Sequence, residues 1–249
     1  MRIKHLLAAA SIVAASVLPL AAETIKIGST PTGVPFTFLD VSTNTITGMM
    51  VDVVNAIGKE AGFTPDVQAV DWVSLIPALT SKRIDVIAAA MSITEERKKV
   101  VTFSDPIFPY GEGLVVKADD DTPYTTSLVE TAGKAIGVQQ GTKYYEDLKA
   151  MPGIGEIRVY ENTADIMRDV ELGRIQVGMA DKPIMGYQIG AGKFPGLKLA
   201  PTYQSQFAAP IGLALRQEDT ALLARINEGL AKIKASGELD SLIKKWNLD

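Results

Sequence analysis

Cysteine is absent from this sequence of 249 residues, and its single histidine is His5, close to the N-terminus. Without cysteine, the chain has no disulfide framework and no thiolate nucleophile. Beyond His5, Ser-His-Asp and Cys-His catalysis are excluded because each needs an imidazole, and zinc sites built from nitrogen and sulfur are excluded with them. We therefore expect no metal site, and only carboxylate, lysine or tyrosine groups remain for acid–base chemistry.

Long apolar runs are confined to the start of the chain. Arg2 and Lys4 precede an apolar stretch over residues 6–20, and two alanines follow it up to Ala22. A basic start, an apolar stretch too short to span a bilayer comfortably and a small-residue exit are typical of a secretory signal peptide. We predict that residues 1–22 are a signal cleaved near Ala22 and that the mature protein is periplasmic. The alternative is an uncleaved anchor.

Positive charge is in slight deficit. The sequence has 25 lysines and arginines against 29 acids, a net charge of −4, and loss of the basic signal makes the remainder more negative. This sign argues against nucleic acid and anionic membrane surfaces as partners. With 47% hydrophobic and 22% charged residues, the composition is that of an ordinary globular protein.

Strand and helix patterns alternate along the rest of the chain. In the first half we predict strands over residues 24–29, 67–70 and 84–91, and helices over 48–60 and 74–81. After a break near Gly111 we predict strands over 114–116, 134–138, 156–160 and 177–180, a helix over 143–150 and another capped by Asn162. A strand over 211–215 and helices over 219–235 and 238–246 are expected to pack on the first half. This alternation predicts the α/β class, with parallel sheets whose faces are covered.

One arginine stands just beyond a predicted buried strand. Ser92 and Thr94 follow the strand over 84–91, Thr94 is a good helix N-cap, and Arg97 lies three residues after it. Hydroxyls, free backbone N–H groups and a guanidinium then meet where open α/β sheets bind ligands. This pattern predicts a carboxylate receptor. The alternative is that Arg97 pairs with Glu95 or Glu96 on the surface.

Four segments around this arginine carry a family resemblance. Residues 71–79, 84–87, 92–99 and 103–106 resemble the polar amino-acid-binding proteins of bacterial ABC importers, which are extracellular solute-binding proteins of family 3. The resemblance implies a two-lobed periplasmic-binding-protein-like fold of type II, with two α/β lobes joined by a two-strand hinge. The first lobe is expected over residues 23–112 and 209–249, and the second over 113–208.

Site residues also follow from this resemblance. It implies that Arg97 forks onto the α-carboxylate of an amino acid, with Ser92 and the backbone of Ala90 at the carboxylate and amino group. From the second lobe, Asp181 would bind the amino group, and the loop of Gln139, Gln140, Gly141 and Thr142 would finish the carboxylate cradle. Trp72 would lie against the ligand. The alternatives are that Ser92 and Asp181 only cap helices and that Trp72 belongs to the core.

Ligand specificity is where the chain departs from its family. Thr30 stands where binders of basic side chains tend to carry an acid, and Gly33 stands where many relatives carry an aromatic residue. These differences favour a neutral, polar or acidic ligand side chain over lysine, arginine or histidine.

The resemblance implies a receptor, not an enzyme. We expect a monomer, without a cofactor, that captures an amino acid by lobe closure and passes it to an inner-membrane ABC permease. The main alternative is a periplasmic enzyme similar to cyclohexadienyl dehydratases, with Asp181 or Glu112 transferring the proton. A second alternative is a ligand-binding partner of a sensor or chemoreceptor.

Overall fold

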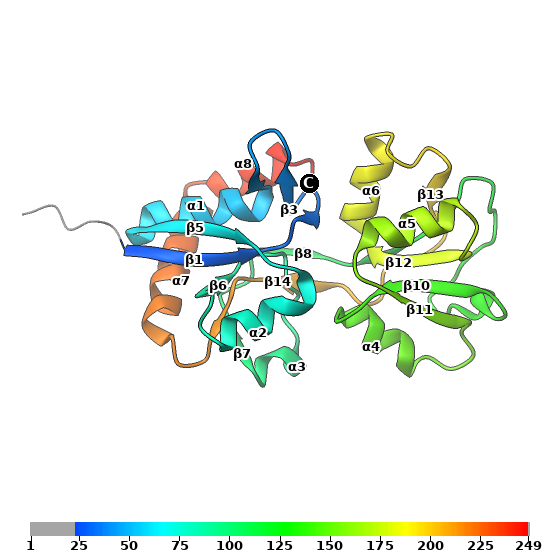
Figure 1. Cartoon of the computed structure of the whole chain (residues 1–249), viewed down its shortest axis with the longest axis horizontal. Coiled ribbons are helices and arrows are strands. Elements are labelled where there is room, and N and C mark those ends of the chain that lie inside the picture. The colour runs from blue at the N-terminus through cyan, green and yellow to red at the C-terminus, as the bar shows by residue number, and fades with distance from the viewer. Residues whose placement is uncertain (1–22, 249) are drawn as a thin grey trace, which may run out of the picture.

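A computed structural model describes residues 23–248, and the predicted signal over residues 1–22 lies outside them. Figure 1 shows two sheet-containing lobes side by side along the long axis of the molecule, with β8 (Phe108–Tyr110) and β14 (Ala209–Ile211) between them. These two strands pair antiparallel, Phe108 opposite Ile211 and Tyr110 opposite Ala209. The predicted type II fold, with two α/β lobes and a two-strand connection, is confirmed.

The first lobe is built on a five-stranded sheet in the order β5-β1-β6-β15-β7. Its strands are β1 (Glu23–Ser29), β5 (Phe63–Ala69), β6 (Val86–Ile87), β7 (Val101–Phe103) and β15 (Ala214–Arg216). β1 pairs parallel with β5 and β6, whereas β15 runs antiparallel to β6 and β7. A small three-stranded sheet of β2 (Thr32–Gly33), β3 (Thr37–Asp40) and β4 (Thr45–Thr47) adjoins it.

Helices of the first lobe come from both ends of the described chain. They are α1 (Met49–Ala61), α2 (Leu75–Thr80) after the 3-10 turn Trp72–Ser74, the short α3 (Glu95–Lys98), α7 (Thr220–Ala235) and α8 (Glu238–Lys245). The predicted return of the C-terminal helices is confirmed, because Ile226 and Leu230 of α7 share one buried cluster with Val53 and Ile57 of α1. Gly62 ends α1 in the left-handed conformation, at φ 73°, which glycine adopts without steric cost.

The second lobe repeats this design over a sheet in the order β11-β10-β12-β9-β13. Its strands are β9 (Glu112–Lys117), β10 (Ala135–Gln139), β11 (Glu156–Tyr160), β12 (Val177–Asp181) and β13 (Leu197–Leu199). Its helices are α4 (Lys143–Ala150), α5 (Thr163–Glu171) and α6 (Lys182–Gly190), with a 3-10 turn at Val129–Thr131. In the first lobe β1 lies between two parallel neighbours, and in the second lobe β10 does, so the carboxyl ends of β1, β6, β10 and β12 can meet at one cleft.

Two predicted strands are shorter or divided. The strand expected over residues 84–91 is only Val86–Ile87, because Ala90 adopts a left-handed conformation with φ 53° and the chain leaves the sheet. The strand expected over 211–215 is two strands, since β14 pairs with β8 while β15 pairs with β6 and β7. The lobe boundaries predicted at 112/113 and 208/209 stay predictions.

Candidate functional site

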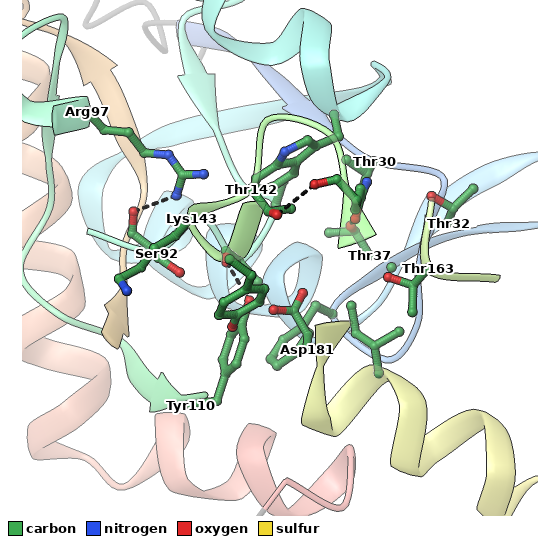
Figure 2. Close-up of a pocket in the computed structure, with 18 residues that line it drawn as sticks. Thr30, Thr32, Thr37, Ser92, Arg97, Tyr110, Thr142, Lys143, Thr163 and Asp181 are labelled. Atoms are coloured by element: carbon green, nitrogen blue, oxygen red, sulfur yellow. Dashed lines mark hydrogen bonds between the residues drawn. The ribbon is translucent and has the colours of Figure 1, made fainter. Parts of the chain in front are cut away.

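A pocket lies between the two lobes, and residues of both line it. The space among its side chains, open mouth included, is about 570 Å³. All eight predicted site residues line it: Thr30, Trp72, Ala90, Ser92, Arg97, Gln139, Thr142 and Asp181. In the view of Figure 2, Arg97 and Ser92 lie on one side, several threonines lie on the other, and Asp181 lies between them.

The Arg97 guanidinium is held by groups of both lobes. Nη1 donates to the Ser92 carbonyl at 2.9 Å, and Nη2 donates to the Gly141 carbonyl of the second lobe at 3.3 Å. The guanidinium carbon lies 5.3 Å from the centre of the Trp72 ring, within cation–π range. Burial lowers the pKa of Arg97, while Tyr110 and Asp181 act in the opposite direction. These contacts therefore hold the positively charged Arg97 guanidinium in one orientation at the edge of the pocket.

Surface pairing of Arg97 with its neighbouring acids is not observed. Glu95 pairs with Lys98 at 2.8 Å, and Glu96 pairs with Lys99. Thr94 is the predicted N-cap, because its hydroxyl accepts from the Arg97 backbone N–H at 3.2 Å. However, α3 is only four residues long, so the expected contribution of a helix N-terminus is small and the guanidinium supplies the charge.

Asp181 ends β12, directly before α6, and its side chain makes no capping hydrogen bond to that helix. The plain helix cap is therefore not what the structure shows. Burial raises the pKa of Asp181 to about 6, although the neighbouring Tyr144 and Tyr110 hydroxyls and the charge of Arg97 favour the ionised form. The nearby Glu112 adds a smaller upward shift. The protein's own groups thus do not fully offset the cost of burying the Asp181 negative charge, and a cation placed in the pocket would stabilise that charge.

The loop between β10 and α4 brings backbone groups to the pocket. Thr142 caps α4, accepting from the Tyr145 N–H at 3.4 Å, and its hydroxyl donates to the Gln139 carbonyl at 2.7 Å. The Gln139 side-chain amide donates to the Glu161 carbonyl at 2.9 Å. Gly141 is left-handed, with φ 71°, and a Cβ on it would lie 3.6 Å from the Trp72 indole nitrogen. Trp72 is half-buried, and its contact with the ligand stays a prediction.

Several lining residues were not predicted from the sequence. They are Thr32, Phe36, Thr37, Ala89, Tyr110, Thr163 and Ile184; Gly33, Lys143 and Tyr144 also line the pocket. The Thr30 and Thr37 hydroxyls lie 2.7 Å apart in a hydrogen bond. Tyr110 donates to the Ala90 carbonyl at 3.0 Å and stacks on Phe36, with ring centres 5.0 Å apart. No local pattern marks these residues, because distant segments bring them together.

Glu112, the other acid considered for proton transfer, does not line the pocket. It is fully buried and accepts hydrogen bonds from Tyr203, Ser205, Gln206 and Phe207. Between residues 23 and 248 there is no group of three or more histidine, cysteine, aspartate or glutamate side chains that could hold a metal ion. The same residues include no helix long and apolar enough to cross a membrane.

Comparison with known proteins gives a consistent result. Residues 25–249 match the bacterial extracellular solute-binding proteins, family 3. The chain is 30% identical to a putative ABC transporter arginine-binding protein 2 of Escherichia coli (strain K12), over 98% of both proteins.

Solved structures agree with this match. An ancestral arginine-binding protein bound to glutamine is 32% identical, with a TM-score of 0.81, over 91% of this chain and 98% of that one. The ancestral amino acid-binding protein AncCDT-1, a precursor of cyclohexadienyl dehydratase, is 30% identical, with a TM-score of 0.80, over 90% and 95%. The chain belongs to the bacterial extracellular solute-binding proteins of family 3.

Proposed function

We propose that this protein is a monomeric periplasmic receptor that binds one amino acid with an uncharged, hydrogen-bonding side chain and delivers it to an ABC permease of the inner membrane. The observation that carries the proposal is the opposition of Arg97 and Asp181 across one pocket between two lobes. The Arg97 guanidinium of the first lobe matches the negative α-carboxylate of a free amino acid. The buried Asp181 carboxylate of the second lobe matches its positive α-ammonium group.

The α-carboxylate is assigned to Arg97, Ser92 and Thr142. Arg97 uses one N–H on the Ser92 carbonyl and one on the Gly141 carbonyl, which leaves three of its five donors for the ligand. The planar fork suits a bidentate carboxylate. The Ser92 hydroxyl and the Thr142 loop complete the cradle from the two lobes.

The α-ammonium is assigned to Asp181 and the Ala90 carbonyl. A cation beside Asp181 offsets the burial that raises its pKa to about 6. The Ala90 oxygen already accepts from Tyr110 at 3.0 Å, and its second lone pair remains for the ligand. Trp72 flanks the carboxylate end of the pocket through its contact with Arg97.

The side-chain end of the pocket is polar and uncharged. Its walls carry Thr30, Thr32, Thr37 and Thr163, which offer hydroxyl donors and acceptors. Among the described lining residues, Asp181 is the only acid, so a lysine or arginine side chain would find no second carboxylate. Lys143 is the second base, but its ammonium pairs with Asp147 at 2.5 Å and lies 4.7 Å from the Phe207 ring centre. An acidic ligand side chain would have to compete with Asp147 for the Lys143 ammonium. A ligand side chain that ends in a hydroxyl or an amide is therefore favoured.

The receptor proposal expects the ligand to bind without being converted, whereas the enzymatic alternative expects a product. AncCDT-1 relates this fold to a dehydratase, and Asp181, with a pKa of about 6, is suited to proton transfer. Glu112, however, is fully buried and hydrogen-bonded on both oxygens. Incubation with prephenate and arogenate tests this alternative, and product formation abolished by Asp181→Asn would favour the enzyme.

A thermal-shift and calorimetric screen of the twenty common amino acids tests the proposal. A ligand at about 100 times its dissociation constant stabilises the folded protein by about 2.7 kcal/mol, or roughly 5 to 10 °C in Tm for a chain of this size. We expect glutamine, asparagine, serine or threonine to give the largest shift and Arg97→Ala to abolish it. Tightest binding of arginine or lysine would contradict the assigned side-chain specificity, and no shift with any amino acid would contradict the receptor.

A further inference from the structure

Glu112 is a fully buried carboxylate that the binding site does not use. It is the first residue of β9, immediately after the first crossing between the lobes, and lies opposite Asp181 in the sheet register. Within the described part of the chain, no lysine or arginine pairs with it. An unpaired buried carboxylate is costly unless hydrogen bonds replace its lost hydration.

Four donors supply that replacement, and all belong to the segment that leads into the second crossing. Oε1 accepts from the Tyr203 hydroxyl and from the Gln206 backbone N–H, both at 2.8 Å. Oε2 accepts from the Ser205 hydroxyl at 2.8 Å and from the Phe207 backbone N–H at 3.1 Å. Each oxygen thus takes one hydroxyl and one backbone N–H, which fills the acceptor capacity of the carboxylate.

The backbone N–H groups of residues 204–208 are bound chiefly by this carboxylate, while the Gln206 side-chain amide donates to the Thr126 carbonyl and Phe207 packs on the second-lobe core. The segment has no regular secondary structure, and within the described chain its only backbone N–H hydrogen bonds are the two to Glu112. A Cβ on Gly111 would lie 1.9 Å from the Ser205 hydroxyl oxygen, so the two crossings approach each other closely here, and a larger residue would displace the Ser205 side chain that donates to Glu112. Glu112 therefore joins the end of one crossing to the start of the other.

Next to Glu112 and the four groups that donate to it, here called the Glu112 clamp, the chain changes lobe within one residue on the first crossing and within three on the second. Tyr110 donates to the Ala90 carbonyl of the first lobe, whereas the next carbonyl, of Gly111, accepts from the Lys182 N–H of the second lobe at 3.0 Å. On the return crossing, Phe207 is bound to Glu112, whereas the Pro210 carbonyl accepts from Ile93 of the first lobe at 2.8 Å.

We propose that Glu112 is a positioning residue that fixes both crossings to the second lobe, so that lobe closure pivots only at Tyr110–Gly111 and Ala208–Ala209. The inference rests on the proposed lobe closure but not on the identity of the ligand. With the clamp intact, the second lobe swings as one body, which carries Asp181 and Thr142 toward Arg97 along a fixed path. Without it, residues 204–208 become additional points of bending and the lobes sample a wider range of orientations.

Glu112→Gln is the decisive variant because it keeps the size of the side chain. A glutamine amide must turn its NH₂ toward one oxygen site or the other, and each site contains a backbone N–H that cannot rotate away. One donor therefore faces another in either orientation. Asp120→Asn is the matched control, since Asp120 also accepts from a backbone N–H and a tyrosine hydroxyl, those of Thr122 and Tyr124, but lies beyond the end of β9 opposite to Glu112.

The absence of cysteine permits a direct measurement of lobe orientation. Ala224→Cys on α7 and Ala150→Cys on α4 place labels on exposed positions of the two lobes. Interlobe distance distributions by double electron–electron resonance are then compared without ligand and with saturating L-glutamine. We expect Glu112→Gln to broaden the ligand-free distribution, Asp120→Asn to leave it unchanged, and hydrogen exchange at the Gln206 and Phe207 amides to accelerate by about ten-fold or more in Glu112→Gln.

A folded Glu112→Gln protein with an unchanged distribution would overturn the proposal, as would equal broadening in Asp120→Asn. If Glu112→Gln does not fold, Ser205→Ala and Tyr203→Phe each remove a single donor, and broadening in both is required. Because the ligand-free readout needs no amino acid, failure of L-glutamine to bind bears on the proposed function and leaves this test intact.

Discussion

Acidification should weaken ligand binding through Asp181. Burial raises the pKa of this carboxyl from its ordinary value of 3.8 to about 6, against the effects of Tyr144, Tyr110 and Arg97. The only histidine of the sequence is His5, so no imidazole titrates in the same range within the described residues. A change of affinity between about pH 7.5 and pH 5 can therefore be assigned to Asp181.

The size of the effect follows from the ionised fraction. At about pH 5, one unit below the pKa, roughly one Asp181 in eleven is ionised in the empty protein. If the ligand ammonium binds only the carboxylate, the affinity should fall by about ten-fold between pH 7.5 and pH 5. The direction is a loss on acidification, because protonation removes the charge that faces the ammonium.

The same shift predicts the stability of the empty protein. Since the folded pKa lies above the unfolded one, the folded state binds the proton more tightly, and stability decreases as pH rises from about 4 to about 6. The full penalty, on the order of 3 kcal/mol, applies above that window. Asp181→Asn should therefore raise the Tm of the empty protein at about pH 7.5 by several degrees while weakening binding of the amino acid.

Calorimetry across this pH range, with wild type and Asp181→Asn, measures both effects. The wild type should lose affinity on acidification, and the variant should bind weakly with little pH dependence. A ligand analogue without the amino group should be far less sensitive to Asp181→Asn than the amino acid itself. Equal weakening of both ligands, or a wild-type affinity that stays constant down to about pH 5, would refute the assigned role of Asp181.

Three further predictions address binding, motion and stability. Arg97→Ala should cost about 2 to 5 kcal/mol of binding free energy, roughly 30-fold to several thousand-fold in calorimetric Kd, and Arg97→Lys should also bind poorly because an ammonium lacks the planar fork. Ligand should reduce the radius of gyration in X-ray scattering and change Trp72 emission, and tight binding with an unchanged scattering profile would contradict lobe closure. Asp52→Ala removes the acceptor of Lys245 at 2.7 Å and of the Trp246 indole at 2.8 Å, so chemical denaturation should show a loss of about 1 to 3 kcal/mol with unchanged affinity.

Local sequence patterns determined the elements of this protein and much of its site. The predicted N-caps at Thr94 and Asn162 form, and Thr142 caps α4 in the same way, because a side chain and a backbone N–H three residues later interact regardless of the rest of the fold. The eight predicted site residues line one pocket, since they follow the ends of strands or belong to segments with a family resemblance. The roles of these residues in ligand binding stay predictions.

Tertiary structure decided where strands end and which distant groups meet. The apolar run over residues 84–91 reads as one strand, but only Val86–Ile87 pairs with β1, because the left-handed Ala90 turns the chain into the cleft. Thr37 reaches the pocket beside Thr30, and Tyr110 reaches it from the crossing between the lobes. The four bonds of Glu112 span more than ninety positions of the sequence. Such contacts depend on how whole sheets and crossings pack, and a period of two or of 3.6 residues along the chain carries no information about them.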